Sequence, residues 1–257
     1  MADAGSKVLI VNADDLGRTP GINAGIFEAH ERGIVTSATL MVGFPAAEAA
    51  ARELPRLPRL GVGLHVALTG ARPLLPPERV PSLVGPDGAF PPHPSRFVDL
   101  DPGEVRSEVE AQFARFQQLT GRLPTHLDSH HHSHRHPVVC EALIEVAKRH
   151  GLPVRNASPE VDARLLQAGV PTTDAFIERF YGPDATLEVL LEILAGVGTG
   201  ITELMCHPAR VDDDLRAGSS YVEEREAELA ALCHAEVLRA VRGMGLELGS
   251  FDGVGGG

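Results

Sequence analysis

Acidic and imidazole side chains follow several of the apolar runs in this sequence. Asp14 and Asp15 come after the run "KVLIVN", and His207 follows the run "ELMC". Carboxylates and imidazoles are ligands for divalent metal ions and are also the usual acids and bases of hydrolysis. Adjacent carboxylates at the edge of a core repel each other. We therefore expect a nearby cation to offset the repulsion, or one of the two to take part in proton transfer.

Adjacent side chains of an extended chain point in opposite directions, so we expect Asp14 and Asp15 to face opposite sides. One of them can bind a metal ion while the other acts as a general base on a water molecule. His207 would then be the acid that protonates the leaving group across the metal from Asp14. An Asp-rich turn after a strand is also common without any chemistry, so the pair gains weight only together with the histidines.

A histidine-rich tract, "THLDSHHHSHRH" at residues 125–136, is the second group of potential ligands. The period of two in a strand places His126, Asp128, His130 and His132 on one face for as long as the chain stays extended. A metal-bound imidazole usually donates its second nitrogen to a carboxylate, so Asp128 can orient one of these rings. Such a tract can also chelate metal ions without a function, but its place at the end of a predicted strand favours a site.

The run "GVGLHVAL" carries His65 among small and apolar residues. Its alternation places Val62, Leu64 and Val66 on one face, which we expect to pack under helices, and His65 on the other face. A lone histidine in such a strand is more often a buried structural residue than a ligand. His65 is a candidate ligand because the aspartate pair and the histidine tract are predicted at the same edge of the sheet.

Apolar runs alternate with helical patterns along the whole chain, which predicts an α/β fold with a parallel sheet. About seven or eight such units favour a single-domain, distorted TIM-like (β/α) barrel over residues 1–257, with its active site at the carboxyl ends of the strands. The predicted strands are Lys7–Asn12, Val35–Val42, Val62–Leu68, Pro124–His130, Pro153–Asn156, Thr172–Ile177, Ile201–Cys206 and Leu246–Phe251. The predicted helices are Gly21–Arg32, Ala46–Glu53, Pro102–Thr120, Pro137–His150, Pro159–Ala168, Ala185–Leu194 and Ser220–Arg242.

Two segments need a separate interpretation. Between Gly70 and Gly103 lie nine prolines, a density that prevents regular secondary structure. We interpret this Pro-rich excursion, at about residues 70–103, as an insertion loop that leaves the catalytic face after the His65 strand and walls the cleft or contacts another subunit. The predicted helix Ser220–Arg242 has apolar residues at helical spacing, and we interpret it as a surface helix with its charges outward.

Composition restricts the classes of function. The formal net charge of −12 argues against a nucleic-acid partner, because phosphate binding needs clustered lysine and arginine. No apolar run approaches the roughly 20 residues of a membrane-spanning helix, so no membrane partner is expected. The three cysteines form no CxxC pair, and we interpret them as reduced thiols in the cytoplasm.

Seven short motifs resemble, in the same order, those of the YdjC/ChbG-type carbohydrate (chitooligosaccharide) deacetylases. They are "LIVNADDLG", "GIVTSATLMV", "GLHVALT", "THLDSHHH", "FYGP", "MCHPA" and "SSYVEEREAEL". The resemblance covers nearly the whole chain and implies a distorted (β/α) barrel. It also implies metal-dependent removal of an acetyl group from an N-acetylated sugar, one divalent ion such as magnesium, and a homodimer.

The resemblance also assigns roles to individual positions. It implies three metal ligands, a base and an acid, which are Asp15, His65, His130, Asp14 and His207. We further expect Arg155 to fix the charge and orientation of Asp14. His126 and His132 remain alternatives to His130, and two imidazoles with one carboxylate also suit zinc, cobalt or nickel.

The residues leave two other functions open. A metal-dependent phosphoesterase in a similar barrel would need more positive charge near its cleft or a second carboxylate-rich metal site. A metal-binding protein without catalysis would use the histidine tract and bind well over one ion per chain. The chain has no tryptophan and only two tyrosines, so few aromatic faces can stack on sugar rings and the expected substrate is a small amino sugar or a disaccharide.

Overall fold

A seven-stranded parallel sheet forms the centre of the computed structural model, which describes residues 5–255. β1 (Lys7–Leu16) lies in the middle, in the strand order β4-β3-β2-β1-β6-β5. β7 pairs with the amino-terminal part of β1. The other strands are β2 (Ser37–Leu40), β3 (Gly61–Val66), β4 (Leu127–Ser129), β5 (Ala175–Ile177), β6 (Gly200–Cys206) and β7 (Glu247–Leu248).

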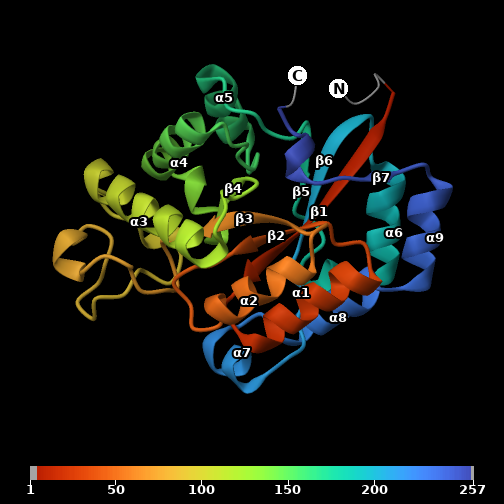
Figure 1. The fold of residues 1–257 in the computed structure, drawn as a ribbon, viewed down its shortest axis with the longest axis horizontal. Coiled ribbons are helices and arrows are strands. Elements are labelled where there is room, and N and C mark those ends of the chain that lie inside the picture. Colours follow the sequence, from red (N-terminus) through yellow and green to blue (C-terminus); the bar gives the residue numbers. More distant parts are fainter. Residues whose placement is uncertain (1–4, 256–257) are drawn as a thin grey trace.

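The sheet curls into a distorted, incompletely closed barrel, which confirms the predicted fold class (Figure 1). The predicted strand Pro153–Asn156 is only an isolated bridge between Val154 and Leu127. This segment lies between β4 and the chain that leads into β5, because it bonds Leu127 on one side and the N–H of Val154 donates to Pro171 on the other. Pro153 has no N–H to donate, which prevents a longer ladder here.

Nine helices lie around the sheet in the described part of the chain (Figure 1). α3, α4 and α5 each end at a glycine with positive φ, namely Gly121, Gly151 and Gly169, a conformation that glycine adopts without strain. The helices are α1 (Pro20–Arg32), α2 (Ala47–Glu53), α3 (Pro102–Thr120), α4 (Pro137–His150), α5 (Pro159–Ala168), α6 (Leu187–Gly196), α7 (Asp213–Gly218), α8 (Glu223–Leu232) and α9 (Ala235–Gly243).

The single helix predicted at Ser220–Arg242 is in fact two helices, α8 and α9. The chain breaks at Cys233 and His234, and the His234 ring accepts the backbone N–H of Glu236, so that His234 caps the start of α9. α8 packs on both α1 and α6, whereas α9 packs on α6.

The Pro-rich excursion leaves β3 and returns to α3 at the left of Figure 1. It contains two short 3₁₀ turns and no strand or α-helix, as its prolines predicted. The buried carboxylate of Glu108 on α3 accepts the N–H groups of Leu74 and Leu75 and thereby anchors the excursion to the barrel. Pro92 and His93 reach the main cavity, so the excursion does contribute to the cavity wall.

The barrel interior is unusually polar. Apolar strand residues pack under the helices, but several strands also direct fully buried polar side chains inward: Asn12, Thr39, His65, Asp128 and Glu203. Buried polar and charged groups are costly unless they are bonded or paired. These residues therefore indicate a functional site inside the barrel.

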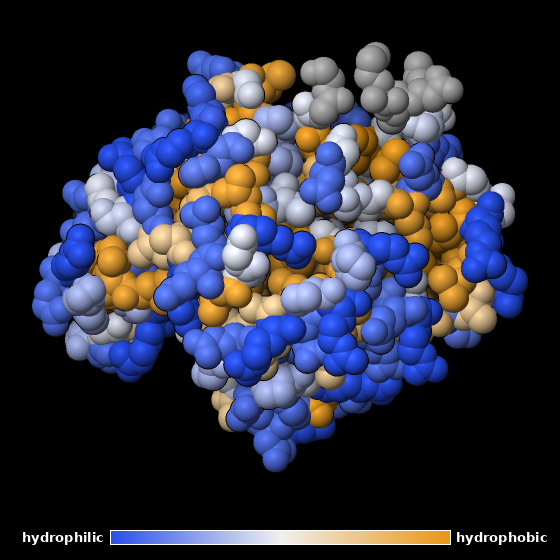
Figure 2. Space-filling view, viewed as in Figure 1, coloured by the Kyte–Doolittle hydropathy of each residue, from blue (hydrophilic) through white to orange (hydrophobic). Residues whose placement is uncertain are grey.

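The outer surface is largely polar as well. Figure 2 shows that hydrophilic side chains cover most of the face seen in Figure 1, with an apolar group between α6 and α9. Among residues 5–255, no helix combines the length and the hydropathy needed to cross a bilayer.

Candidate active site

A cavity of about 740 Å³ opens at the carboxyl ends of the strands. It is lined by residues at or just after the ends of β1, β3, β4 and β6: Asp14, Asp15, His65, His130 and His207. The parallel sheet brings together side chains that are far apart in the sequence, because all its strands end on the same side. The convergence expected from the sequence is therefore present.

Arg155 is fully buried and contacts three carboxylates, those of Asp14, Asp128 and Glu203; we call these four residues the Arg155 cluster. Its guanidinium donates to both oxygens of Asp14 at 2.7 Å and to Oε1 of Glu203 at 2.8 Å. Oδ2 of Asp128 lies 3.0 Å from Nη1. The expected contact between Arg155 and Asp14 is thus present in two-point form, which fixes the orientation of a carboxylate.

The charges of the Arg155 cluster differ from one carboxylate to the next. Burial raises the pKa of Asp14, but the Arg155 guanidinium more than offsets it and holds the pKa well below its usual range. Asn12 donates a further hydrogen bond to Asp14 at 2.9 Å. Burial raises the pKa of Glu203 to about 7, because Arg155 stabilises its charge only in part. Asp14 is therefore ionised and held in place at neutral pH.

Asp128 orients His65 rather than a ring of its own histidine tract. Nδ1 of His65 donates to Asp128 at 2.7 Å, and the hydroxyl of Thr39 lies 3.1 Å from the same nitrogen. Burial lowers the pKa of His65, but Asp128 and the aspartate pair raise it overall to about 9. The bond at Nδ1 leaves Nε2 of His65 directed toward Asp15, at 3.6 Å from its Oδ1.

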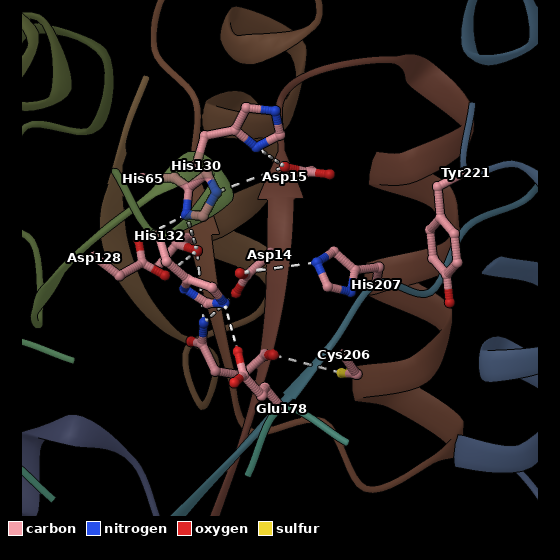
Figure 3. A network of polar contacts seen from close by, with 12 residues as sticks. Asp14, Asp15, His65, Asp128, His130, His132, Glu178, Cys206, His207 and Tyr221 are labelled. Carbon is pink, nitrogen blue, oxygen red and sulfur yellow. Dashed lines mark hydrogen bonds and ion pairs between the residues drawn. The ribbon is translucent and has the colours of Figure 1, made fainter. Parts of the chain in front are cut away.

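Asp15 does not continue the extended chain, and the expected opposite orientation of the two aspartates is wrong. Its φ of 71° turns the chain, so that Asp14 and Asp15 line the same cavity (Figure 3). Oδ2 of Asp15 accepts a hydrogen bond from Arg225 at 2.6 Å and lies 3.6 Å from Arg18. Together with Arg155 on Asp14, these arginines supply the positive charge that the aspartate pair requires.

Three potential ligand atoms meet beside this pair. Asp15, His65 and His130, which we call the Asp15 cluster, each offer one atom within 4.8 Å of the others. Oδ1 of Asp15 lies 3.1 Å from Nδ1 of His130 (Figure 3), yet it is buried and has no hydrogen-bond partner among residues 5–255. A buried carboxylate oxygen that faces two ring nitrogens without bonding to either is suited to a cation.

His132 and His126, the alternatives to His130, are not part of the Asp15 cluster, although His132 lines the same cavity. Nε2 of His132 is 3.3 Å from Glu178. His126 is fully buried and stacks on Phe251, with 3.6 Å between the ring centroids. The chain leaves the extended conformation after His130, because the next two residues have positive φ. The face predicted from strand alternation therefore ends at His130.

A second group, Asp14, His65 and Asp128, also has ligand-like spacing. Its atoms already have partners, since His65 donates to Asp128 and Arg155 contacts both carboxylates. A metal ion there would have to displace a buried and paired guanidinium, which is costly. The Asp15 cluster is the better candidate for a cation.

His207 faces Asp14 across the cavity, with 3.9 Å between its Nε2 and Oδ2 of Asp14 (Figure 3). Its Nδ1 is buried and has no hydrogen-bond partner in the described part of the chain. The rings of Tyr181 and Tyr221 contact it edge-on, with centroids 5.4 and 5.8 Å away. Burial lowers the pKa of His207 to about 3, against the opposing charge of Asp14. The imidazole is therefore neutral at rest.

Three further residues of the site were not predicted: Tyr221, Arg225 and Glu228. All three are buried. Arg225 and Glu228 are three residues apart on one face of α8, and Tyr221 lies just before the helix. The expectation that the charges of this helix point outward is therefore wrong for Arg225 and Glu228. A signal was present in the sequence, because an arginine and a glutamate recur at the spacing of the helix's apolar face.

These features define a class of protein, an α/β barrel with a site of carboxylates and histidines at the carboxyl ends of its strands. The chain belongs to the YdjC-like protein family, whose model matches residues 8–243. It is 43% identical to a carbohydrate deacetylase from Geobacillus stearothermophilus over 243 residues, which cover 94% of this chain and 96% of the relative. It is 39% identical to a chitooligosaccharide deacetylase from Serratia marcescens, covering 96% of this chain and 98% of the relative.

Two solved structures share the fold. One is a protein from Enterococcus faecalis V583 described as a candidate cellobiose-phosphate cleavage protein, with a TM-score of 0.91, 36% identity, and coverage of 96% of this chain and 98% of that chain. The other is a family 4 carbohydrate esterase from Streptomyces lividans in complex with acetate, with a TM-score of 0.56 and 14% identity over 96% and 93% of the two chains. The comparisons confirm the family resemblance and the barrel fold.

Proposed function

We propose that this chain is a metal-dependent carbohydrate N-deacetylase that hydrolyses the acetamide of a small N-acetylated amino sugar or short oligosaccharide. The observation that carries the proposal is the Asp15 cluster, where a buried carboxylate oxygen without a partner faces two imidazoles beside Asp14 and His207. The names of the Geobacillus and Serratia relatives, a carbohydrate and a chitooligosaccharide deacetylase, support the same reaction.

We assign Asp15, His65 and His130 as ligands of one divalent ion. The residues fit such an ion, because Asp15 keeps one oxygen unbonded and the bond to Asp128 leaves Nε2 of His65 facing Asp15, where it can hold the ion once it releases its proton. When bound, the ion supplies a Lewis acid that polarises the acetamide carbonyl and makes water more acidic. The family resemblance favours magnesium, whereas two imidazoles and one carboxylate also suit zinc, cobalt or nickel.

Asp14 is the general base in this proposal, and Arg155 keeps it ionised and oriented. Asp14 takes a proton from water as the water oxygen bonds to the acetamide carbon. His207 first takes up a proton from solvent, and its imidazolium then donates a proton from Nε2 to the amine nitrogen as the carbon–nitrogen bond breaks, which releases acetate and a free amino sugar. Asp14 passes the proton that it took from water to solvent. Because burial disfavours the charged form of His207, a neighbouring carboxylate must stabilise the imidazolium before it can donate.

The aromatic lining of the cavity supports a small substrate. Tyr181 stacks on Tyr221 with 4.1 Å between ring centroids, and it remains 45% exposed at the cavity. One exposed tyrosine can stack on one sugar ring. We therefore assign the N-acetylated sugar ring to the Tyr181 side of the cavity.

The cavity holds more positive charge than the sequence indicated, which bears on the phosphoesterase alternative. Arg18, Arg135 and Arg225 all line it. Arg18 and Arg225 are paired with Asp15, and Arg135 is paired with Glu178. Asp14, Asp15 and Glu178 line the same cavity, so its three arginines face three carboxylates and the positive charge does not favour a phosphate ester over an acetamide.

We further propose that residues 1–257 form one domain with an insertion at about 70–103, and that the protein is a cytoplasmic homodimer. The three cysteines are free, and Cys140 and Cys206 are buried, which suits a reducing compartment. Sedimentation of the purified protein tests the dimer directly, with a monomer as the contradicting result.

Acetate release tests the proposed function. The protein is treated with a chelator and then assayed on N-acetylglucosamine and short N-acetylated chitooligosaccharides with magnesium, zinc, cobalt or nickel. We expect acetate and free amine in equal amounts, and only with added ion. His130→Ala should lose both tight metal binding and activity, while His136→Ala, outside the cavity, should keep both. Acetate release without any ion, or binding of several ions per chain without acetate release, would contradict the proposal.

A further inference from the structure

The buried face of the α8 segment contains two charged residues for which the proposed reaction has no role. Arg225 and Glu228 are 2% and 0% exposed, and Tyr221, just before the helix, is 8% exposed. Buried charges of this kind are costly and must be compensated by specific contacts. Arg225 contacts Asp15 at one end of the candidate site, and Glu228 contacts His207 at the other.

Arg225 contacts the Asp15 cluster from outside. Its Nη2 donates to Oδ2 of Asp15 at 2.6 Å, while its Nε donates to the carbonyl of Tyr221 at 3.0 Å. The guanidinium is thus fixed by its own helix turn and occupies one oxygen of Asp15. The other oxygen, Oδ1, is left to face His65 and His130.

Glu228 contacts His207 in a comparable way. One oxygen accepts the backbone N–H of His207, and the other accepts the Tyr221 hydroxyl at 2.5 Å. The Tyr221 hydroxyl in turn accepts the N–H of Gly182 at 2.9 Å. Oε1 of Glu228 also lies 3.9 Å from Nδ1 of His207, the ring nitrogen that has no partner.

Glu228 is the carboxyl group that faces Nδ1 of His207. Burial lowers the pKa of His207 to about 3 and raises the pKa of Glu228 to about 8. An imidazolium and a carboxylate at these positions stabilise each other, because each ion offsets the burial of the other. A small movement of the ring toward Glu228 would close a hydrogen bond at Nδ1 and leave Nε2 facing the cavity and Asp14.

We propose that α8 positions both ends of the site, with Arg225 holding Asp15 so that one oxygen is presented to the metal ion and Glu228 accepting the Nδ1 proton of His207. The inference rests on the proposed function for the role of His207 as an acid. Both residues act through another side chain and are positioning residues. Such outer contacts typically affect metal affinity or activity by about 10–100-fold.

The test of Arg225 uses zinc binding alone. We expect Arg225→Lys and Arg225→Gln to weaken zinc binding by about 10–100-fold in titration calorimetry, and Arg239→Lys, exposed on α9, to leave it unchanged. Loss of a cation beside Asp15 should by charge alone strengthen zinc binding. Zinc binding by Arg225→Gln as tight as wild type, or tighter, in a protein with an unchanged unfolding transition, would therefore overturn the assignment.

The test of Glu228 uses the protonation of His207. We expect nitrogen NMR of the zinc-loaded protein to show a proton on Nδ1 of His207, identified by the loss of its signals in His207→Gln. Glu228→Gln should remove this preference and lower kcat by about 10–100-fold with KM unchanged. Glu224→Gln, four residues earlier on α8, should change neither quantity.

These readouts separate the two proposals. If wild type releases no acetate but the Arg225 and Glu228 variants still alter zinc affinity and His207 protonation, the proposed function fails while the positioning role stands. If acetate is released and the variants behave like wild type in all three measurements, the positioning role is overturned.

Discussion

The Arg155 cluster and the Asp15 cluster surround adjacent aspartates, yet they compensate buried charge differently. Arg155 bonds both oxygens of Asp14, whereas Arg225 bonds only one oxygen of Asp15 and leaves the other without a partner. A carboxylate with both oxygens bonded is held in one orientation, whereas a buried carboxylate oxygen without a partner is suited to binding a ligand. Two identical neighbouring residues can therefore have different tasks, because the side chains around them differ.

The largest effect should follow from removing the basicity of Asp14. Asp14→Asn keeps the size of the side chain and most of its hydrogen bonds, but the amide cannot take a proton from water. We expect the rate of acetate release to fall by about 10²–10⁴-fold, as is usual for the loss of a general base. A rate close to wild type on a confirmed substrate would show that Asp14 is only structural.

A second large effect is expected on the stability of the folded protein rather than on the rate of acetate release. Arg155→Met leaves the three carboxylates of the Arg155 cluster without their shared cation. We expect the free energy of unfolding to fall by about 3–5 kcal/mol in urea titrations, because removing one partner of a buried ion pair leaves the other buried charges uncompensated. Arg149→Met, which removes an exposed pair with Glu110, should cost about 1 kcal/mol or less. Equal losses would mean that the cluster does not differ from a surface pair.

The pH dependence of stability gives a smaller effect within the same cluster. The pKa of Glu203 is raised to about 7 in the folded protein from an ordinary value of 4.5. Between these values the folded state keeps a proton that the unfolded state has lost, so Glu203 makes stability fall as pH rises through this window. In metal-free protein, Glu203→Gln should remove that part of the decline, and the exposed Glu247→Gln should not. An identical slope in Glu203→Gln and wild type would contradict the shift.

The smallest effect should come from a residue that contacts neither aspartate. Tyr181→Ala removes the exposed aromatic face of the cavity but leaves both clusters intact. We expect KM to rise by about 2–10-fold with kcat nearly unchanged, in line with a stacking contact. A large loss of kcat would show that Tyr181 acts on His207, its edge-on neighbour, rather than on the sugar.

The sequence was sufficient to predict the fold and the residues that meet at the strand ends. The β and α alternation indicates a parallel barrel, and a parallel sheet places all its carboxyl ends on one side. Only local features failed, such as the bridge at Pro153–Asn156 and the break at Cys233. The short bridge depends on the missing backbone N–H of Pro153, and the helix break depends on the cap that His234 provides. Hydrophobic periodicity reports neither.

The orientation of the side chains at the site was harder to predict than the identity of the residues that form it. The positive φ of Asp15 and of the residues after His130 turns the chain where strand alternation assumed an extended one. Arg225 and Glu228 were missed because charged residues on a helix usually face solvent, and their burial depends on partners that come from distant segments. The contact between Arg155 and Asp14 was predicted, since both lie at predicted strand ends.

Metal affinity of the two aspartate variants tests the division of tasks most directly. Zinc is titrated into Asp14→Asn and Asp15→Asn by calorimetry, beside wild type. Asp14→Asn should bind zinc with nearly wild-type affinity although it is slow, because Asp14 belongs to the Arg155 cluster. Asp15→Asn should bind zinc far more weakly, and excess ion should restore part of its activity. Loss of zinc binding in Asp14→Asn together with its retention in Asp15→Asn would contradict the account.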